Sequence, residues 1–551
     1  MTNDFKKYKE EVLDSKSTSF CGAKWFNATT WLGSGTTASC HHPPAHKIPL
    51  IEIETDYTAI HNTKHKKEMR RQMQTGKRPS ECEYCWKMED METDAVSDRV
   101  FKSVIYSDSE LQRAFDLNHH ENVNLKTFEI AFDRTCNLAC SYCNASFSTT
   151  WAKDIKNNGP YENLVSDGAG AFKQDGSHTQ LYDNDDDNPY IQAFWKWWDN
   201  GLSDSLDELR ITGGEPLMSG NTWKLFDWFE KQNSNMGFAI NSNLIAKASI
   251  IDKLVSKAKN INNFSIYTSC EATGKQAEYI RDGLDYNQWK SNLVRMLSET
   301  DAQVNIMMTI NSLCLFSITD FLDEVYALKS EYRKDLAVSL NLVRFPSFQS
   351  PLALPVHLKD YCYNNLNDWY QKNKDREYWM PHEKASIERL IDYLITVDAP
   401  HRRTSNPVTL WRDFKTFYQQ YDIRRNKDIN VFPKILTDWI ESIPDTDSSI
   451  MELAENEGWV LNPEWANIKD PLGTYDKFPH AKRVHGIKGI HQAHIEAAKN
   501  AFTSMVWIVD ADAHVVDTFD FSYVPNRIDR DAVHVWRAKN PVNDLVYVMA
   551  E

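Results

Sequence analysis

The chain has 551 residues, of which 41% are hydrophobic, so it can bury the cores of roughly two to four domains. Its formal net charge of −16 argues against a protein that binds nucleic acid or an anionic membrane through a basic surface. No apolar run approaches the length of a membrane span, and the first residues lack the apolar core of a secretion signal. Ten cysteines, mostly at metal-ligand spacings, favour the reducing cytoplasm over a secreted disulfide scaffold.

The first domain that we expect is a polar, cysteine-containing module over residues 1–100. Cys82 and Cys85 form a Cys-x2-Cys knuckle, and Cys21 and Cys40 precede it. Four thiols in one polar segment predict a closed four-thiolate metal site.

Two metals fit this ligand set. A [4Fe–4S] cluster takes four cysteines. A structural zinc ion also takes four ligands, and His41 or His42 could then replace one thiolate. Thiols that hold no metal are the third alternative.

Residues 125–345 alternate between strand and helix patterns, which predicts an α/β domain with a parallel sheet. The strands that we expect are 126–132, 207–212, 236–241, 262–269, 303–310 and 336–343. A long insertion separates the first two strands. Its centre, Gly168 to Asn188, is rich in Gly, Asp and Asn, which favours a mobile, solvated loop.

Three cysteines follow the first expected strand at Cys-x3-Cys-x2-Cys spacing, namely Cys136, Cys140 and Cys143. Three thiolates can ligate three irons of a [4Fe–4S] cube, which leaves the fourth iron open to a small ligand. Because such clusters usually take four cysteines, the open position predicts chemistry rather than a structural role. A structural zinc site would normally complete its tetrahedron.

The second expected strand runs into Gly213-Gly214-Glu215-Pro216. The three-cysteine loop after one strand, with this motif after the next, resembles the radical S-adenosylmethionine (radical SAM) superfamily. The resemblance implies a partial (β/α)6 barrel and a [4Fe–4S] cluster that binds S-adenosylmethionine (SAM). It also implies reductive cleavage of SAM to methionine and a 5′-deoxyadenosyl radical, which abstracts hydrogen from a substrate. The electron would come from a donor such as flavodoxin or ferredoxin.

The same resemblance assigns cofactor contacts to the motif residues. Tyr142 corresponds to the aromatic residue that packs near the adenine. Gly213 and Gly214 would let the backbone approach the methionyl amino group, since they lack a Cβ atom. Glu215 and Pro216 complete the motif.

Further cofactor contacts depend on motifs that depart from the usual pattern. Ser269 and Glu271 occupy a segment like Ser-x-Asp-Gly, with Glu for Asp and Ala for Gly. Either would face the ribose or the methionyl carboxylate, and Arg281 would hold that carboxylate in a two-pronged pair. Asn243 ends the third strand, where many relatives carry Thr-Asn-Gly.

The four-cysteine module resembles the auxiliary-cluster segment of radical SAM proteins with SPASM or twitch modules. That segment usually follows the barrel, whereas here it precedes the barrel, as in a group of phage-type relatives. The resemblance favours a second [4Fe–4S] cluster, with zinc as the alternative. The isolated Cys270, Cys314 and Cys362 are expected to be buried packing residues.

The remaining chain divides into a helical extension over 346–448 and a fragment over 455–551 that resembles part of an A-type glycosyltransferase. Asp510 and Asp512 form an Asp-x-Asp pair that can hold a divalent ion. The fragment lacks a recognisable nucleotide-binding half, which favours a binding or packing module over an active transferase.

The sequence therefore predicts a radical SAM enzyme that acts on an unidentified peptide, protein or sugar. The rival interpretation is a non-catalytic metal-cluster scaffold that binds a glycan or a protein partner.

Overall fold

The computed structural model describes residues 2–90, 96–182, 185–333, 335–395, 407–456, 537–539 and 546–548. The chain divides into two compact units. The first is Met1–Ile395 with Thr409–Ile443, and the second is Thr396–Val408 with Pro444–Glu551. Both cysteine motifs lie in the first unit.

A nine-stranded sheet is the centre of the first unit, with the strand order β11-β10-β8-β7-β6-β4-β1-β2-β3. Seven strands, from β11 to β1 in that order, run parallel, whereas β2 and β3 are antiparallel. The strands are β1 Asn27–Trp31, β2 Thr36–Ala38, β3 His46–Lys47, β4 Thr127–Ala131, β6 Glu208–Thr212, β7 Gly237–Ser242, β8 Phe264–Ser269, β10 Gln303–Ile310 and β11 Ala337–Leu342.

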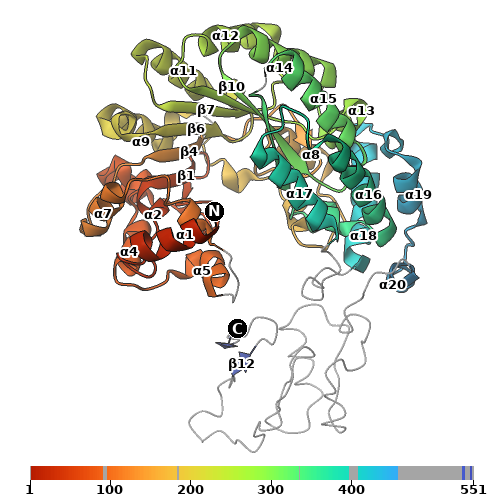
Figure 1. The fold of residues 1–551 in the computed structure, drawn as a ribbon, viewed down its shortest axis with the longest axis horizontal. Coiled ribbons are helices and arrows are strands. Elements are labelled where there is room, and N and C mark those ends of the chain that lie inside the picture. The colour runs from red at the N-terminus through yellow and green to blue at the C-terminus, as the bar shows by residue number, and fades with distance from the viewer. Residues whose placement is uncertain are drawn as a thin grey trace, which may run out of the picture. The chain divides into compact units, whose positions relative to one another are not determined.

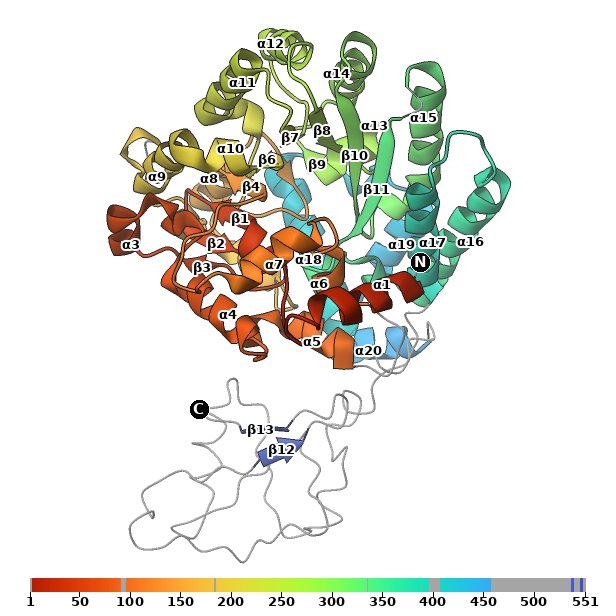
Figure 2. The same ribbon diagram turned by 60° about the vertical axis from the view of Figure 1, so that its left-hand side comes forward.

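All six predicted strands form, and they are neighbours in chain order as β4, β6, β7, β8, β10 and β11. Residues along β8 and β10 alternate between buried and more exposed positions, which is the period-two pattern of a strand with two different faces. Helices between consecutive strands lie along one face of the sheet (Figures 1 and 2), as right-handed crossovers require. These helices are α9 Pro189–Trp197, α10 Ser203–Ser205, α11 Gly220–Gln232, α12 Ala248–Ala258, α14 Tyr286–Glu299 and α15 Ile318–Glu331.

The cysteine-containing module joins this sheet, which the sequence did not predict. Its strand β1 pairs in parallel with β4, with Thr30 opposite Ile130. Short helices pack around a core that includes Phe20, Trp25 and Trp86. They are α1 Thr2–Tyr8, α2 Ala23–Phe26, α4 Lys64–Gln74, α5 Glu83–Asp90, α6 Asp98–Phe101 and α7 Asp108–Asp116, whereas α3 Leu50–Thr55 contacts α9. The module is therefore fixed to the strand that leads into the three-cysteine loop.

The insertion after β4 is packed over part of its length. It contains α8 Thr149–Asn158, and its described centre forms short 3₁₀ turns rather than the expected solvated loop. Phe172 is 1% exposed, and its ring lies 4.8 Å from that of Phe417. An aromatic residue thus anchors a segment whose composition is mostly polar.

The expected helical extension forms α16 Val356–Asn373, α17 Pro381–Ile395, α18 Pro407–Arg425 and α19 Lys434–Ser442. A fully buried ion pair attaches α17 to α15 and the sheet. Lys329 Nζ donates to both carboxylate oxygens of Glu383, at 2.8 and 2.9 Å. The same carboxylate accepts the backbone N–H of Val338 in β11 at 2.9 Å.

The described part of the second unit includes helix α20 Asp447–Asn456 and an antiparallel pair, β12 Arg537–Lys539 and β13 Val546–Val548. Asp510 and Asp512 lie outside the described residues, so their predicted ion site stays a prediction. None of the described helices has the length and apolar character needed to cross a bilayer.

Candidate active site

The three-cysteine loop follows β4, and a second, small sheet holds it in place. Strand β5 (Ala139–Cys140) pairs antiparallel with β9 (Arg281–Asp282), which places Cys140 opposite Arg281. Next to this pair, the Ser141 N–H donates to the Ile280 carbonyl at 2.7 Å. Cys140 and Arg281, which are 141 residues apart in the chain, are therefore neighbours.

Side chains from other elements hold the backbone of this loop. Trp151 Nε1 in α8 donates to the Cys140 carbonyl at 2.9 Å, and Gln349 Nε2 donates to the Ser141 carbonyl at 3.0 Å. Ser148 Oγ donates to the Leu138 carbonyl at 2.7 Å. These contacts orient the loop before any metal binds. The sequence analysis missed Trp151 and Gln349, because a single Trp or Gln carries no spacing signal.

Burial governs the chemistry of the three thiols. It raises the pKa of Cys136 to about 12 and also raises the pKa values of Cys140 and Cys143. The charges of the neighbouring cysteines raise the pKa of Cys143 further. Without a cation the thiols are therefore protonated, and a bound metal must stabilise the thiolates.

Arg281 and Glu271 form a buried ion pair beside Cys140. Arg281 Nη2 lies 2.5 Å from Glu271 Oε2, and Arg281 Nε lies 3.1 Å from both carboxylate oxygens. Arg281 Nη1 points elsewhere and lies 3.7 Å from Cys140 Sγ. Tyr142 joins the group, because its hydroxyl donates to Glu271 Oε1 at 3.2 Å and its ring lies 5.5 Å from the guanidinium. Three residues predicted to contact SAM thus converge at the cysteine loop.

Ser269 ends β8, two residues before Glu271, and is partly exposed. It stands opposite Met307 of β10 in the sheet register. Its predicted contact with the ribose or the carboxylate stays a prediction.

The paired glycines pack directly against the segment that leads into the cysteine loop. Gly213 has a φ of +117°, and a Cβ atom there would lie 2.6 Å from the Asp133 carbonyl oxygen. A Cβ atom on Gly214 would lie 2.2 Å from the Thr135 oxygen. Residues with side chains would therefore push the two loops apart. The structure gives the glycines this packing role, and their contact with a methionyl amino group stays a prediction.

Glu215 connects the ends of β6 and β7. Its carboxylate accepts hydrogen bonds from Ser242 Oγ and the Asn243 N–H, both at 2.7 Å. Asn243 Nδ2 in turn donates to Asn137 Oδ1 in the cysteine loop at 2.9 Å. The predicted residues Glu215 and Asn243 thus belong to one network, and Pro216 begins the short helix η8 (Pro216–Met218) behind it.

The Glu215 carboxyl group should make stability depend on pH. Burial raises its pKa from 4.5 to about 7, so the folded protein binds this proton more tightly than the unfolded chain does. That stabilisation is complete below about pH 4.5 and is lost as the pH rises through about 7. Between about pH 4.5 and 8, the unfolding free energy of the wild type should fall by on the order of 3 kcal/mol relative to Glu215→Gln. Urea denaturation of both proteins at the two pH values tests this. An equal change of unfolding free energy in the wild type and in Glu215→Gln would contradict it.

Helix α18 forms ion pairs with β9 and α8, the two elements that contact the cysteine loop. Arg425 Nη1 lies 2.8 Å from Asp282 Oδ2 in β9, and Nη2 lies 3.2 Å from Asp154 Oδ2 in α8. Its guanidinium also stacks 4.3 Å from the Trp151 ring. The helical extension is therefore part of the framework of the site.

The four amino-terminal cysteines also converge. Cys21, Cys40, Cys82 and Cys85 line one small pocket, although they come from separate loops and from helix α5. Burial raises the pKa values of Cys82 and Cys85 to about 12, and the charges of the other cysteines of the pocket raise them further. The predicted grouping of these four thiols is thus present.

The spacing of the sulfur atoms bears on the choice between a zinc ion and a cluster. Zinc with Zn–S bonds of about 2.3 Å brings tetrahedral sulfurs to about 3.8 Å from one another. Among the described residues, no three cysteine sulfurs lie within 4.8 Å of one another, whereas ligand atoms of His41, His42 and Asp98 do. His42 Nε2 is 2.7 Å from Asp98 Oδ2, so its ring nitrogen is engaged there.

The isolated cysteines behave as expected. Cys270, Cys314 and Cys362 are buried. The Cys270 thiol donates to the Ala272 carbonyl at 3.4 Å, and the Cys314 thiol donates to the Asn311 carbonyl at 3.3 Å.

Comparison with known proteins gave only distant similarities. No family model and no curated protein matches the chain. Among solved structures, SuiB of Streptococcus suis bound to S-adenosylmethionine matches with a TM-score of 0.30 and 14% identity, over 50% of this chain and 56% of SuiB. SuiB bound to its precursor peptide SuiA matches with the same TM-score and 12% identity, over 60% of this chain and 66% of SuiB. The chain thus spans little more than half of SuiB in the first of these matches, a likeness too distant to establish a fold or an activity.

Proposed function

We propose that the protein is a radical SAM enzyme whose catalytic [4Fe–4S] cluster is held by Cys136, Cys140 and Cys143. The main evidence for this proposal is the residue that lies beside the three cysteines. Arg281, rather than a fourth thiol, approaches Cys140, and the nearby Cys270 thiol is engaged with a carbonyl. A three-thiolate site next to a guanidinium suits a cluster whose open iron takes a ligand with a carboxylate. When bound, the cluster supplies the electron that cleaves SAM to methionine and a 5′-deoxyadenosyl radical.

The surrounding residues fit the groups of SAM. Arg281 Nε and Nη2 are paired with Glu271, and Nη1, which already faces Cys140 Sγ, would offer its second N–H to a carboxylate. Glu215 provides a buried carboxyl group near the cysteine loop, which suits the methionyl ammonium. In this proposal the six strands from β4 to β11 form the partial barrel around the cofactor.

The residues around the site favour a peptide or protein substrate over a sugar. Large apolar side chains are exposed after the carboxyl ends of three parallel strands, with Phe147 48%, Met218 51% and Phe345 66% exposed. The carboxyl ends of parallel strands lie at the same end of the sheet, and in this proposal a chain-like ligand bound there would cover these side chains.

Two side-chain amide atoms without hydrogen-bond partners also favour a peptide substrate. Asn241 and Asn305 stand on either side of Tyr267 in the sheet register. Among the described residues, the buried Asn241 Oδ1 and Asn305 Nδ2 have no hydrogen-bond partner. One acceptor and one donor complement an amide group, which a peptide provides.

We further propose that the four-cysteine pocket holds a second [4Fe–4S] cluster of the SPASM or twitch type. Flavodoxin or ferredoxin would supply electrons. The glycosyltransferase-like role of residues 455–551 remains a prediction, because most of that fragment lies outside the described residues.

Reductive SAM cleavage separates this proposal from a non-catalytic scaffold. The anaerobically reconstituted protein should form 5′-deoxyadenosine and methionine when a strong reductant and SAM are supplied. A scaffold with two filled cluster sites would form neither product.

A further inference from the structure

Three buried cations stand beside the four-cysteine pocket. Lys24 in α2 is 2% exposed and lines the pocket directly. Lys66 and Arg70 in α4 are each 1% exposed. Lys66 Nζ donates to Thr37 Oγ1 at 2.8 Å and to the Ala38 carbonyl at 3.2 Å, and Ala38 is two residues before Cys40 in the chain.

Among the described residues, Glu81 provides the carboxylate that pairs with this group of cations. Glu81 pairs with Lys24 through one oxygen, while its other oxygen is 2.6 Å from His65 Nε2. Arg70 Nε donates to the Lys24 carbonyl at 3.0 Å. In the described parts of the chain, no carboxylate lies within ion-pair distance of Lys66 or Arg70. The positive charge on this side of the pocket therefore exceeds the negative charge that the protein provides.

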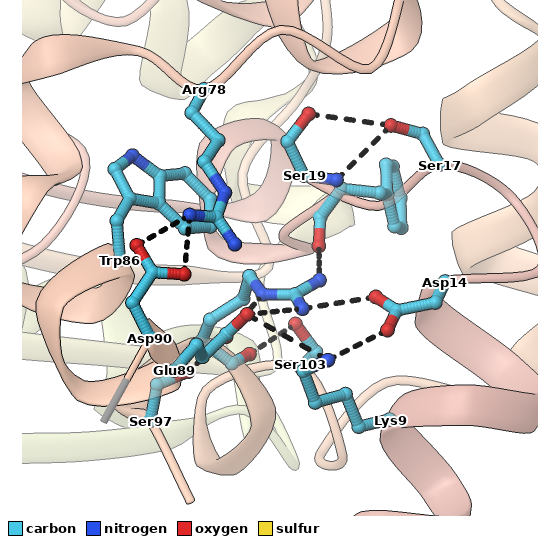
Figure 3. A network of polar contacts seen from close by, with 12 residues as sticks. Lys9, Asp14, Ser17, Ser19, Arg78, Trp86, Glu89, Asp90, Ser97 and Ser103 are labelled. Atoms are coloured by element: carbon cyan, nitrogen blue, oxygen red, sulfur yellow. Dashed lines mark hydrogen bonds and ion pairs between the residues drawn. The ribbon is translucent and has the colours of Figure 1, made fainter. Parts of the chain in front are cut away.

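Arg99, which also lines the pocket, is neutralised within the protein. Its guanidinium donates to Glu89 at 2.8 and 2.9 Å and to Asp14 at 3.0 Å. Glu89 and Asp14 approach from different sides in the network drawn in Figure 3. The contrast shows that the fold can place carboxylates around a buried cation, yet it places none next to Lys66.

A buried, unpaired cation is costly, because water no longer solvates it and no anion replaces the water. Burial, followed by the charges of Arg70 and Lys24, lowers the pKa of Lys66 far below its usual value, so the neutral amine is favoured until a negative charge nearby restores the ammonium form. An anion in the adjacent pocket would balance these charges. A four-thiolate cluster carries net negative charge and gains one further negative charge on reduction.

We propose that Lys24 and Lys66 are positioning residues that stabilise the one-electron-reduced form of the auxiliary cluster. The inference rests on the proposed cluster at the four cysteines. In the reduction, one electron passes from the electron donor to the cluster, and no bond forms or breaks. The buried ammonium groups favour the more negative product, so they raise the reduction potential.

The test is a redox titration, followed by electron paramagnetic resonance, of full-length protein in which Cys136, Cys140 and Cys143 are alanine. Only the auxiliary cluster then contributes to the signal. Lys24→Met and Lys66→Met should each lower the equilibrium constant for reduction of the cluster at least tenfold. A tenfold change lowers a one-electron reduction potential by 59 mV. The matched control is Lys64→Met, which removes an exposed lysine from the same helix as Lys66 and should leave the potential unchanged.

Two further variants keep the proposal testable. Lys24→Arg retains the charge and should retain the potential. If Lys24→Met fails to hold iron, Lys66→Met alone decides the question. An unchanged potential in Lys66→Met at full iron content would overturn the proposal. Zinc in place of iron would also overturn it, whereas the SAM-cleavage assay on the wild type would still test the catalytic proposal separately.

Discussion

Replacing Cys136, Cys140 and Cys143 together with alanine is expected to halve the iron content of the anaerobically reconstituted protein. Two [4Fe–4S] clusters correspond to about eight irons per chain, and the triple variant should retain about four. SAM cleavage should disappear entirely, because the remaining cluster has four thiolates and no open iron. Iron and sulfide analysis with a product assay measures both effects.

Two controls make this expectation specific. Cys82→Ala with Cys85→Ala should remove the other half of the iron, since these thiols line the second pocket. Cys362→Ala should retain all of it, because that buried cysteine belongs to neither site. Full iron content in the triple variant would show that the three-cysteine loop does not hold a cluster.

Arg281→Ala is expected to weaken both folding and SAM binding. It leaves Glu271 buried without its partner, and breaking such a pair costs about 3–5 kcal/mol of unfolding free energy. Loss of a charge-assisted bond to the methionyl carboxylate should weaken SAM binding roughly tenfold or more. Denaturation and equilibrium SAM binding to the cluster-loaded protein measure the two effects separately.

A second substitution distinguishes the two roles of Arg281. Arg281→Met combined with Glu271→Gln removes both charges, so much of the stability should return. SAM binding should stay weak, because the guanidinium is still missing. The control Arg295→Ala breaks only surface ion pairs and should change stability by less than about 1 kcal/mol. Wild-type SAM affinity in the double variant would contradict the proposed role of Arg281.

The sequence was sufficient to predict the six strands of the sheet, because strands such as β4 alternate over most of their length and contain β-branched and aromatic residues. It did not predict β1 (Asn27–Trp31), because this strand has five residues and is mostly polar. The strand is defined by its pairing with β4, and pairing between distant segments leaves no local pattern. The packing of Phe172 was missed for the same reason.

At the site, the motif residues could be predicted from the sequence, but the residues that hold the cysteine loop in place could not. The cysteine spacing and the paired glycines identify the loop from the sequence alone. The closeness of Arg281 to Cys140 depends on the β5–β9 pairing, which the sequence does not reveal. Trp151, Gln349 and Arg425 act as single residues from distant elements, so only the fold identifies them.

The most direct test of the account is the fate of SAM in the reconstituted, reduced protein. We predict that 5′-deoxyadenosine and methionine form in equal amounts, that both require reductant, and that both are absent in the Cys136, Cys140 and Cys143 triple alanine variant. A fully iron-loaded wild-type protein that leaves SAM intact under these conditions would contradict the assignment as a radical SAM enzyme.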